Sequence, residues 1–124
     1  MAKKKILMVD DEKEWVKMLT LRLEHNGYEV DIAFDTAGGI SQAIKLRPDC
    51  ILLDIMMPAG GGIMALENFR KNANTFNIPV IVVTAKPDNQ TKEIAEKLGV
   101  SGYFIKPIDA AKLMEKIKEV LLYK

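Results

Sequence analysis

The chain has 124 residues, a length that fits one compact domain with a core of ordinary size. Its 18 Lys and Arg residues nearly balance 17 Asp and Glu residues, so it lacks the basic excess of a nucleic-acid-binding domain. The single cysteine, Cys50, excludes an internal disulfide, and the apolar run after the N-terminal lysines is too short for a signal peptide or a membrane span. We therefore expect a soluble cytoplasmic domain, residues 1–124, that binds neither nucleic acid nor membrane.

Short aliphatic runs alternate five times with longer segments of helical periodicity, which predicts five strand–helix repeats. The first strand ends at Val9, and the helix after it is predicted over residues 12–26, with Asp11 as its N-cap and Gly27 as its stop. The other expected elements are strand 28–34, a helix ending near Arg47, strand 49–54, a helix with Ile63, Leu66 and Phe69 inward, strand 78–83, a helix capped by Asp88, strand 102–105 and a helix capped by Asp109. Short connections favour right-handed crossovers, so the sheet is predicted to be parallel and covered on both faces.

Glycines and apolar spacing give finer expectations for three of these helices. Gly38 and Gly39 each cost about 1 kcal/mol relative to Ala inside a helix, so we expect the second helix to start late or to be mobile at its start. Residues 57–62 are predicted to form a pliant loop, because the glycines there lack the following Lys and Ser or Thr of a phosphate-binding loop. In the fourth helix, Ile94 and Ala95 are expected to face inward.

Four predicted strands end in the residues that a phosphoryl-transfer site requires. Asp10 and Asp11 follow the first strand, Asp54 ends the third, Thr84 ends the fourth and Lys106 follows the fifth. The carboxyl ends of parallel strands share one edge of a sheet, where the ligand crevice lies, so we expect these side chains to meet. Three carboxylates repel one another unless a cation or a proton relieves them, and Mg²⁺ prefers such oxygen ligands. Lys106 and Thr84 offer an ammonium and a hydroxyl to phosphoryl oxygens, which leaves Asp54 as the candidate nucleophile.

Each of these residues also has a structural explanation when it is taken alone. Asp11 is a good helix N-cap, Thr84 is a β-branched residue at a strand end, and Lys106 is an ordinary surface charge. The order of acidic pair, acid, hydroxyl and lysine at four strand ends is much less easily produced by chance. The combination therefore indicates function where the single residues do not.

The chain resembles the receiver domain of two-component response regulators and is similar to single-domain, chemotaxis-type regulators. The segments that carry the resemblance are Val9-Asp10-Asp11, Leu52-Leu53-Asp54, Met57-Pro58 with Gly62, Thr84-Ala85 and Lys106-Pro107. The resemblance implies a doubly wound, flavodoxin-like α/β fold of five βα units, with a parallel sheet in the strand order 2-1-3-4-5. This strand order is taken from the family and does not follow from the spacing of the residues.

For function, the resemblance implies a signalling phosphoacceptor in a phosphorelay rather than an enzyme. Asp54 would accept a phosphoryl group from a sensor histidine kinase or a histidine phosphotransfer protein. Mg²⁺ would be bound by Asp10, Asp11, Asp54 and the backbone carbonyl of Met56. The sequence identifies neither the kinase nor the downstream protein target, and it leaves open a monomer or a dimer that forms on phosphorylation.

The resemblance also implies how the phosphoryl group is sensed. Thr84 and Lys106 would bind its oxygens, and the peptide bond between Lys106 and Pro107 would be cis. Tyr103 stands at the position of the aromatic switch residue and would follow Thr84 inward on phosphorylation, although a half-buried strand aromatic is the simpler interpretation of Tyr103 alone. The output surface would be the fourth helix, fifth strand and fifth helix, over about residues 88–123, which would control partner binding.

Two positions that tune hydrolysis of the acyl phosphate in the family are occupied here by Met56 and Lys86. Neither side chain can orient an attacking water as a carboxylate or an amide does. We therefore expect slow autodephosphorylation.

Several alternatives stay open on the sequence. A haloacid-dehalogenase-like phosphatase also uses an aspartyl phosphate, but it needs an acid where Met56 stands. A flavodoxin-like cofactor binder needs a phosphate loop where Asp10 and Asp11 would repel phosphate. A pseudo-receiver would bind partners without phosphorylation, and the set of Asp54, Thr84 and Lys106 argues against it. The chain is either a stand-alone regulator or the receiver of a longer protein.

Overall fold

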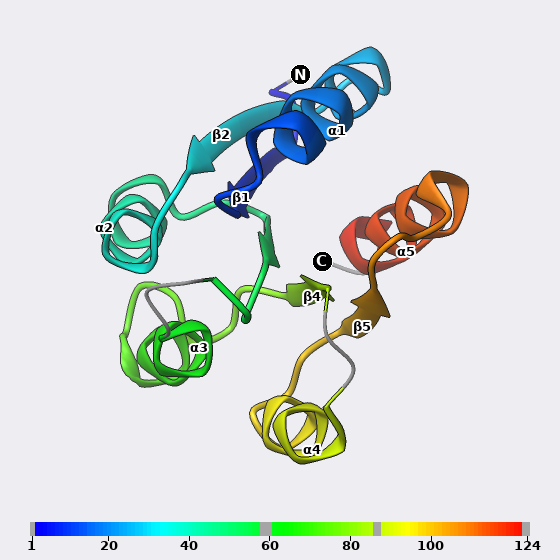
Figure 1. The fold of residues 1–124 in the computed structure, drawn as a ribbon. Helices are drawn as coiled ribbons and strands as arrows, with labels where there is room; N and C mark the ends of the chain where they lie inside the picture. Colours follow the sequence, from blue (N-terminus) through cyan, green and yellow to red (C-terminus); the bar gives the residue numbers. More distant parts are fainter. Residues whose placement is uncertain (1, 58–60, 86–87, 123–124) are drawn as a thin grey trace.

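The computed structural model describes residues 2–57, 61–85 and 88–122, which form one five-stranded parallel sheet covered by five helices (Figure 1). The strands are β1 (Lys5–Val9), β2 (Glu29–Ala33), β3 (Cys50–Leu53), β4 (Val80–Thr84) and β5 (Gly102–Ile105). The helices are α1 (Lys13–His25), α2 (Thr36–Leu46), α3 (Gly62–Lys71), α4 (Asn89–Lys97) and α5 (Ala110–Leu122). The strand order is β2-β1-β3-β4-β5, which confirms the expected flavodoxin-like α/β fold.

Strand register brings the polar residues that follow or end the strands to one edge of the sheet. Val9 of β1 lies opposite Leu53 of β3, and the Asp54 N–H donates to the Val9 carbonyl at 2.9 Å. Asp10 and Asp54 therefore leave neighbouring strands at the same level. On the other side of β3, the Lys106 N–H donates to the Thr84 carbonyl at 2.7 Å, so the fifth strand also delivers its last residue to this edge.

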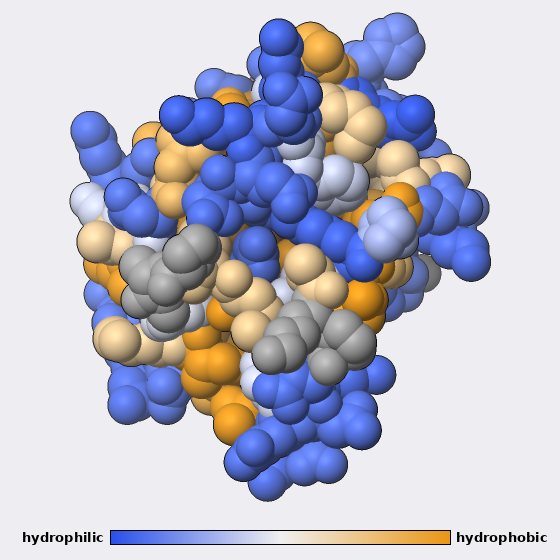
Figure 2. Space-filling view, in the orientation of Figure 1, coloured by the Kyte–Doolittle hydropathy of each residue, from blue (hydrophilic) through white to orange (hydrophobic). Residues whose placement is uncertain are grey.

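Two hydrophobic clusters cover the two faces of the sheet, because successive side chains of a strand point to opposite faces. One cluster includes Leu7 and Leu53 and is closed by α2, α3 and α4. The other includes Ile6 and Leu52 and is closed by α1 and α5, which lie together on the opposite side of the sheet in Figure 1. All four residues of β3 are buried, as a central strand requires. In the same orientation, Figure 2 shows hydrophobic surface between the α3 and α4 regions.

The two glycines of α2 do not delay the helix, so the expectation of a late or mobile start is wrong. The helix begins at Thr36, and the Asp35 side chain caps it by accepting a 2.6 Å hydrogen bond from the Gly38 N–H. Gly39 is buried against β1, where an added Cβ would lie 2.8 Å from a methyl carbon of Val9. Here the absence of a side chain lets α2 pack closely on the sheet, and that contact offsets the low helix propensity of glycine.

The predicted cap of α1 is also wrong. The cap residue is Glu12, which makes no side-chain capping bond, and its N–H donates to Asp10 Oδ1 at 2.9 Å. Asp10 therefore satisfies the donor at the helix start, while Asp11 lies with the acidic cluster described below. The caps predicted for α4 and α5 are confirmed, since Asp88 accepts from Gln90 and Thr91, and Asp109 accepts from Ala111.

Two further predictions differ from the structure, one in the residue at which a helix begins and one in the face that a helix buries. Gly62 is the first residue of α3, so the loop predicted through position 62 ends one residue earlier. Ile94 is 40% exposed, whereas Ala95 is fully buried. Consecutive helical residues are rotated by about 100°, and the close approach of Ala95 to the core turns Ile94 toward the surface. No helix within the described ranges has the length and apolar character that a bilayer span requires.

Candidate functional site

Three carboxylates meet at the carboxyl ends of β1 and β3. The carboxylate oxygens of Asp10, Asp11 and Asp54 all lie within 4.8 Å of one another. Asp10 and Asp54 are buried, and Asp11 is exposed. The three acids that the sequence places at strand ends are therefore neighbours in the fold.

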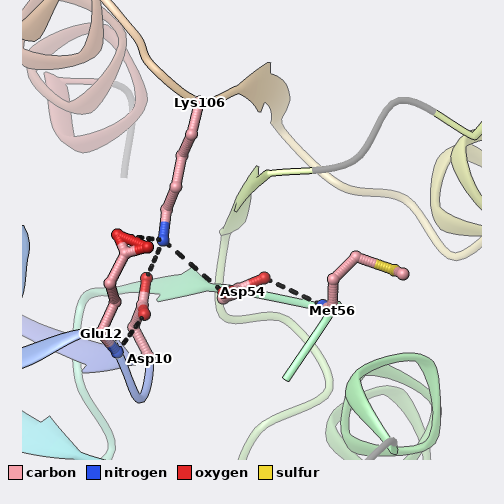
Figure 3. A network of polar contacts seen from close by, with 5 residues as sticks. All are labelled: Asp10, Glu12, Asp54, Met56 and Lys106. Carbon is pink, nitrogen blue, oxygen red and sulfur yellow. Dashed lines mark hydrogen bonds and ion pairs between the residues drawn. The ribbon is translucent and has the colours of Figure 1, made fainter. Parts of the chain in front are cut away.

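Lys106 reaches into this acidic cluster from the end of β5 (Figure 3). Its Nζ lies 2.8 Å from Asp10 Oδ2, 3.6 Å from Asp54 Oδ2 and 3.6 Å from Glu12 Oε2. Burial alone would lower the pKa of Lys106, but its hydrogen bond to Asp10 and the charges of the three carboxylates raise the pKa above its ordinary value. The ammonium is therefore held in its charged form, with side-chain exposure of only 9%.

One ammonium does not neutralise the acidic cluster. Burial raises the pKa of Asp10 above its ordinary value, although the hydrogen bonds from Lys106 and from the Glu12 N–H act in the opposite direction. Four acidic side chains, Asp10, Asp11, Glu12 and Asp54, lie in or beside the cluster, and among the described residues Lys106 is the one cation that forms ion pairs there. The excess of negative charge and the all-oxygen donor set fit a hard divalent cation such as Mg²⁺, which binds carboxylates while keeping several waters.

The carboxylate of Asp54 is oriented by the chain that follows it. Its Oδ1 accepts a 2.9 Å hydrogen bond from the Met56 N–H, and its Oδ2 faces Lys106 (Figure 3). The two oxygens therefore have different environments, one fixed by a backbone N–H and the other facing the Lys106 ammonium. The Met56 side chain is 38% exposed beside the site.

Two hydroxyls are buried near this edge of the sheet. Thr84 is fully buried at the end of β4, and within the described ranges neither its Oγ1 nor the Tyr103 hydroxyl has a hydrogen-bond partner. Burial, and next the charge of Asp88, raise the pKa of Tyr103. A buried polar group without a partner costs about 1–3 kcal/mol, so a ligand that satisfies the Thr84 hydroxyl would recover that cost. The Nζ of Lys92 on α4 lies 5.8 Å from the centre of the Tyr103 ring.

Sequence reasoning assigned neither Glu12 nor Trp15 to the site. The structure places both beside Lys106, whose Nζ is 5.4 Å from the centre of the Trp15 ring. Glu12 caps α1 and Trp15 lies three residues later, a spacing that puts both on one side of the helix and that was available in the sequence.

Of the other features predicted near the site, the structure describes the cis peptide bond but not two of the residues. The peptide bond between Lys106 and Pro107 is cis, as the resemblance implies. Pro58 and Lys86 lie outside the described residues.

Comparisons with known proteins agree over nearly the whole chain. The family model of the response regulator receiver domain matches residues 6–118. The response regulator ArlR of Staphylococcus saprophyticus is 37% identical over 117 residues, which cover 94% of this chain and 52% of ArlR. ArlR of Staphylococcus aureus strain Mu50 is 34% identical over 116 residues, with the same coverage of both chains. The chain thus spans about half the length of these relatives.

Solved structures lead to the same family. The CheY-like response regulator receiver domain protein of Methanospirillum hungatei JF-1 superimposes with a TM-score of 0.92 at 30% identity, over 98% of this chain and 96% of that protein. The chemotaxis protein CheY4 of Vibrio cholerae gives a TM-score of 0.88 at 28% identity, over 96% of this chain and 99% of CheY4. Because sequence, fold and the acidic cluster agree, the chain belongs to the family of response regulator receiver domains of two-component systems, for which phosphorylation and Mg²⁺ are general features.

Proposed function

We propose that residues 1–124 form one receiver domain that accepts a phosphoryl group on Asp54 in a two-component phosphorelay. The donor is a phosphohistidine on a sensor histidine kinase or on a histidine phosphotransfer protein, and the reaction takes place in the cytoplasm. The observation that carries this proposal is the Lys106 ammonium held between Asp10 and Asp54 inside a cluster of three aspartates. A structural salt bridge needs one carboxylate, whereas this cluster has an excess of them.

Asp54 is the nucleophile of the proposed reaction. Its Oδ2 does not take the Met56 hydrogen bond and is therefore the oxygen available to attack phosphorus. The new O–P bond forms as the N–P bond of phosphohistidine breaks, and the electron pair of that bond returns to the imidazole nitrogen, which takes a proton. The product is an acyl phosphate on Asp54.

The other residues bind charge that develops around phosphorus. Asp10, Asp11, Asp54 and the Met56 carbonyl would hold Mg²⁺. When bound, the ion supplies positive charge to phosphoryl oxygens and relieves repulsion among the carboxylates. Lys106 turns from the carboxylates to a phosphoryl oxygen, and the buried hydroxyl of Thr84 donates to another.

Phosphorylation then changes the surface that partners recognise. Thr84 moves toward the phosphoryl group. The side chain of Tyr103, on the neighbouring strand, then moves inward after it. The face formed by α4, β5 and α5 has different affinity for a downstream protein in the two states. The domain acts as a switch for that protein. It works either as a monomer or as a dimer that forms on phosphorylation.

The test is phosphorylation by a small donor. With MgCl₂ and acetyl phosphate, intact-mass measurement should find one added phosphoryl group on the wild-type chain and none on Asp54→Asn. Chelation of the metal with EDTA should also prevent the modification, because the acidic cluster is then unrelieved. Asp31→Asn is the matched control, since Asp31 is a half-buried aspartate on β2 outside the site, and this variant should be modified normally. An unmodified wild type, or a modified Asp54→Asn, would reject the proposal.

A second prediction concerns the lifetime of the acyl phosphate. Met56→Asn combined with Lys86→Glu should speed its hydrolysis by about tenfold or more, because these side chains can orient a water for attack. Loss of the added phosphoryl mass is followed over time after removal of the donor. Met56→Leu keeps an apolar side chain and should leave the lifetime unchanged. Equal half-lives for the double variant and the wild type would show that these positions do not limit hydrolysis.

A further inference from the structure

The indole ring of Trp15 contacts the same ammonium as the acidic cluster. Lys106 Nζ lies 5.4 Å from the ring centre, within the distance at which an aromatic face attracts a cation. The Lys106 side chain is only 9% exposed, so little water competes for the ammonium. Trp15 is half-buried and packs against the hydrophobic cluster between the sheet and α1 and α5, which fixes the position of the ring.

Among the described neighbours of the Lys106 ammonium, the Trp15 ring differs from the three carboxylates because it carries no charge. Asp10 and Asp54 have other tasks in the proposed function, because both bind the metal and Asp54 carries the phosphoryl group. Glu12 is 3.6 Å away with a side chain that is 56% exposed, so its attraction is screened by water. The aromatic face attracts the ammonium without binding Mg²⁺ and without adding negative charge that would repel a phosphoryl group. Its hold on Lys106 therefore persists when the carboxylates engage other ligands.

We propose that Trp15 is a positioning residue, whose ring face keeps the Lys106 ammonium at the phosphoryl site while Asp10 and Asp54 engage other ligands. This inference rests on the proposed function. A lysine side chain has four rotatable bonds, and restricting them before the reaction lowers the entropic cost of placing the charge. Trp15 does not touch the reacting atoms and acts only through Lys106.

The contact itself can be tested without phosphorylation. An ammonium above an indole face has its neighbouring methylene protons shifted upfield by the ring current, so the Lys106 Cε protons should resonate upfield of those of exposed lysines in an NMR spectrum. Trp15→Leu should abolish this shift, and Trp15→Phe should retain part of it. Lysine Cε protons that stay at the same position in all three proteins would overturn the proposal.

Kinetics then test the role in phosphoryl transfer. Trp15→Leu should lower the rate of modification by acetyl phosphate and MgCl₂ by about 2-fold to 30-fold, the range expected from the strength of cation–π attraction. Trp15→Phe keeps an aromatic face and should fall between Trp15→Leu and the wild type. The control is Phe34→Leu, which removes the aromatic partner of Lys13 at the same end of the molecule and should leave the rate unchanged.

A double-mutant cycle separates positioning from packing. In a Lys106→Met background, Trp15→Leu and Trp15→Phe should phosphorylate at equal rates, because the cation that the ring holds is gone. A rate difference of the same size with and without Lys106 would overturn the proposal and assign Trp15 to packing alone. Complete absence of modification in the wild type would instead reject the proposed function, and the NMR shift would still decide whether Trp15 holds Lys106.

Discussion

Replacing Gly62 with Ala is expected to lower the free energy of unfolding by about 3 kcal/mol or more. A Cβ at this position would lie 2.2 Å from the Cα and 2.5 Å from the carbonyl oxygen of Ile55. Both atoms are backbone, so no side-chain rotation relieves the contact, and either α3 or the segment after β3 has to move. Because Ile55 directly follows Asp54, a shift of this segment also disturbs the proposed phosphoacceptor.

Urea unfolding followed by circular dichroism measures the effect of Gly62→Ala. The matched control is Gly99→Ala, where nothing lies within 4 Å of the added Cβ but the backbone has a φ of +75°. That variant should lose about 1–2 kcal/mol from its left-handed conformation alone. Equal stability of the two variants would mean that the close approach of α3 to Ile55 is not a constraint.

Arg70→Ala is expected to destabilise the fold by about 2–4 kcal/mol. The guanidinium lies at the end of α3 and donates to four backbone carbonyls, at 2.7 Å to Leu98, 3.0 Å to Ile78 and 3.3 Å to both Phe76 and Gly99. These carbonyls belong to the approach to β4 and to the end of α4, so one side chain joins three segments. Burial lowers the pKa of Arg70, and truncation would leave carbonyls in that environment without their donor.

The same unfolding measurement tests Arg70, with two comparison variants. Arg70→Lys should recover only part of the loss, because an ammonium cannot reproduce the planar fork of the guanidinium. Lys71→Ala removes the neighbouring exposed cation from the same helix end and should change stability by less than about 0.5 kcal/mol. An Arg70→Ala protein as stable as Lys71→Ala would show that the carbonyl contacts contribute nothing.

The fold class and the clustering of the site residues could be predicted from the sequence, because both follow from patterns within short segments of the chain. Apolar runs of strand length mark β1 and β3, and the residue after each run must emerge at the same edge of a parallel sheet. Asp10, Asp54 and Lys106 could therefore be assigned to one place from their order alone, before any contact between them was known. The strand order itself came from family resemblance.

Features that depend on packing between distant segments were not predicted. The four acceptors of Arg70 are backbone carbonyls, which carry no residue-type signal in the sequence. The glycines of α2 were judged by helix propensity, whereas the close approach of Gly39 to Val9 and of Gly38 to Asp35 is visible only in the fold. The capping role given to Asp11 failed for a local reason instead, since the Asp10 carboxylate accepts the Glu12 N–H at the start of α1.

The position of β5 at the edge of the sheet has a mechanical consequence. In the sheet of the described residues, β5 pairs with β4 only, so displacing β5 disrupts one ladder of hydrogen bonds, whereas displacing an inner strand disrupts two. Its consecutive residues Tyr103 and Phe104 pack on opposite faces of the sheet, the first on the side of α4 and the second on the side of α5. A pull on Lys106, which continues this strand, would therefore act on the packing of both helical layers through one edge strand.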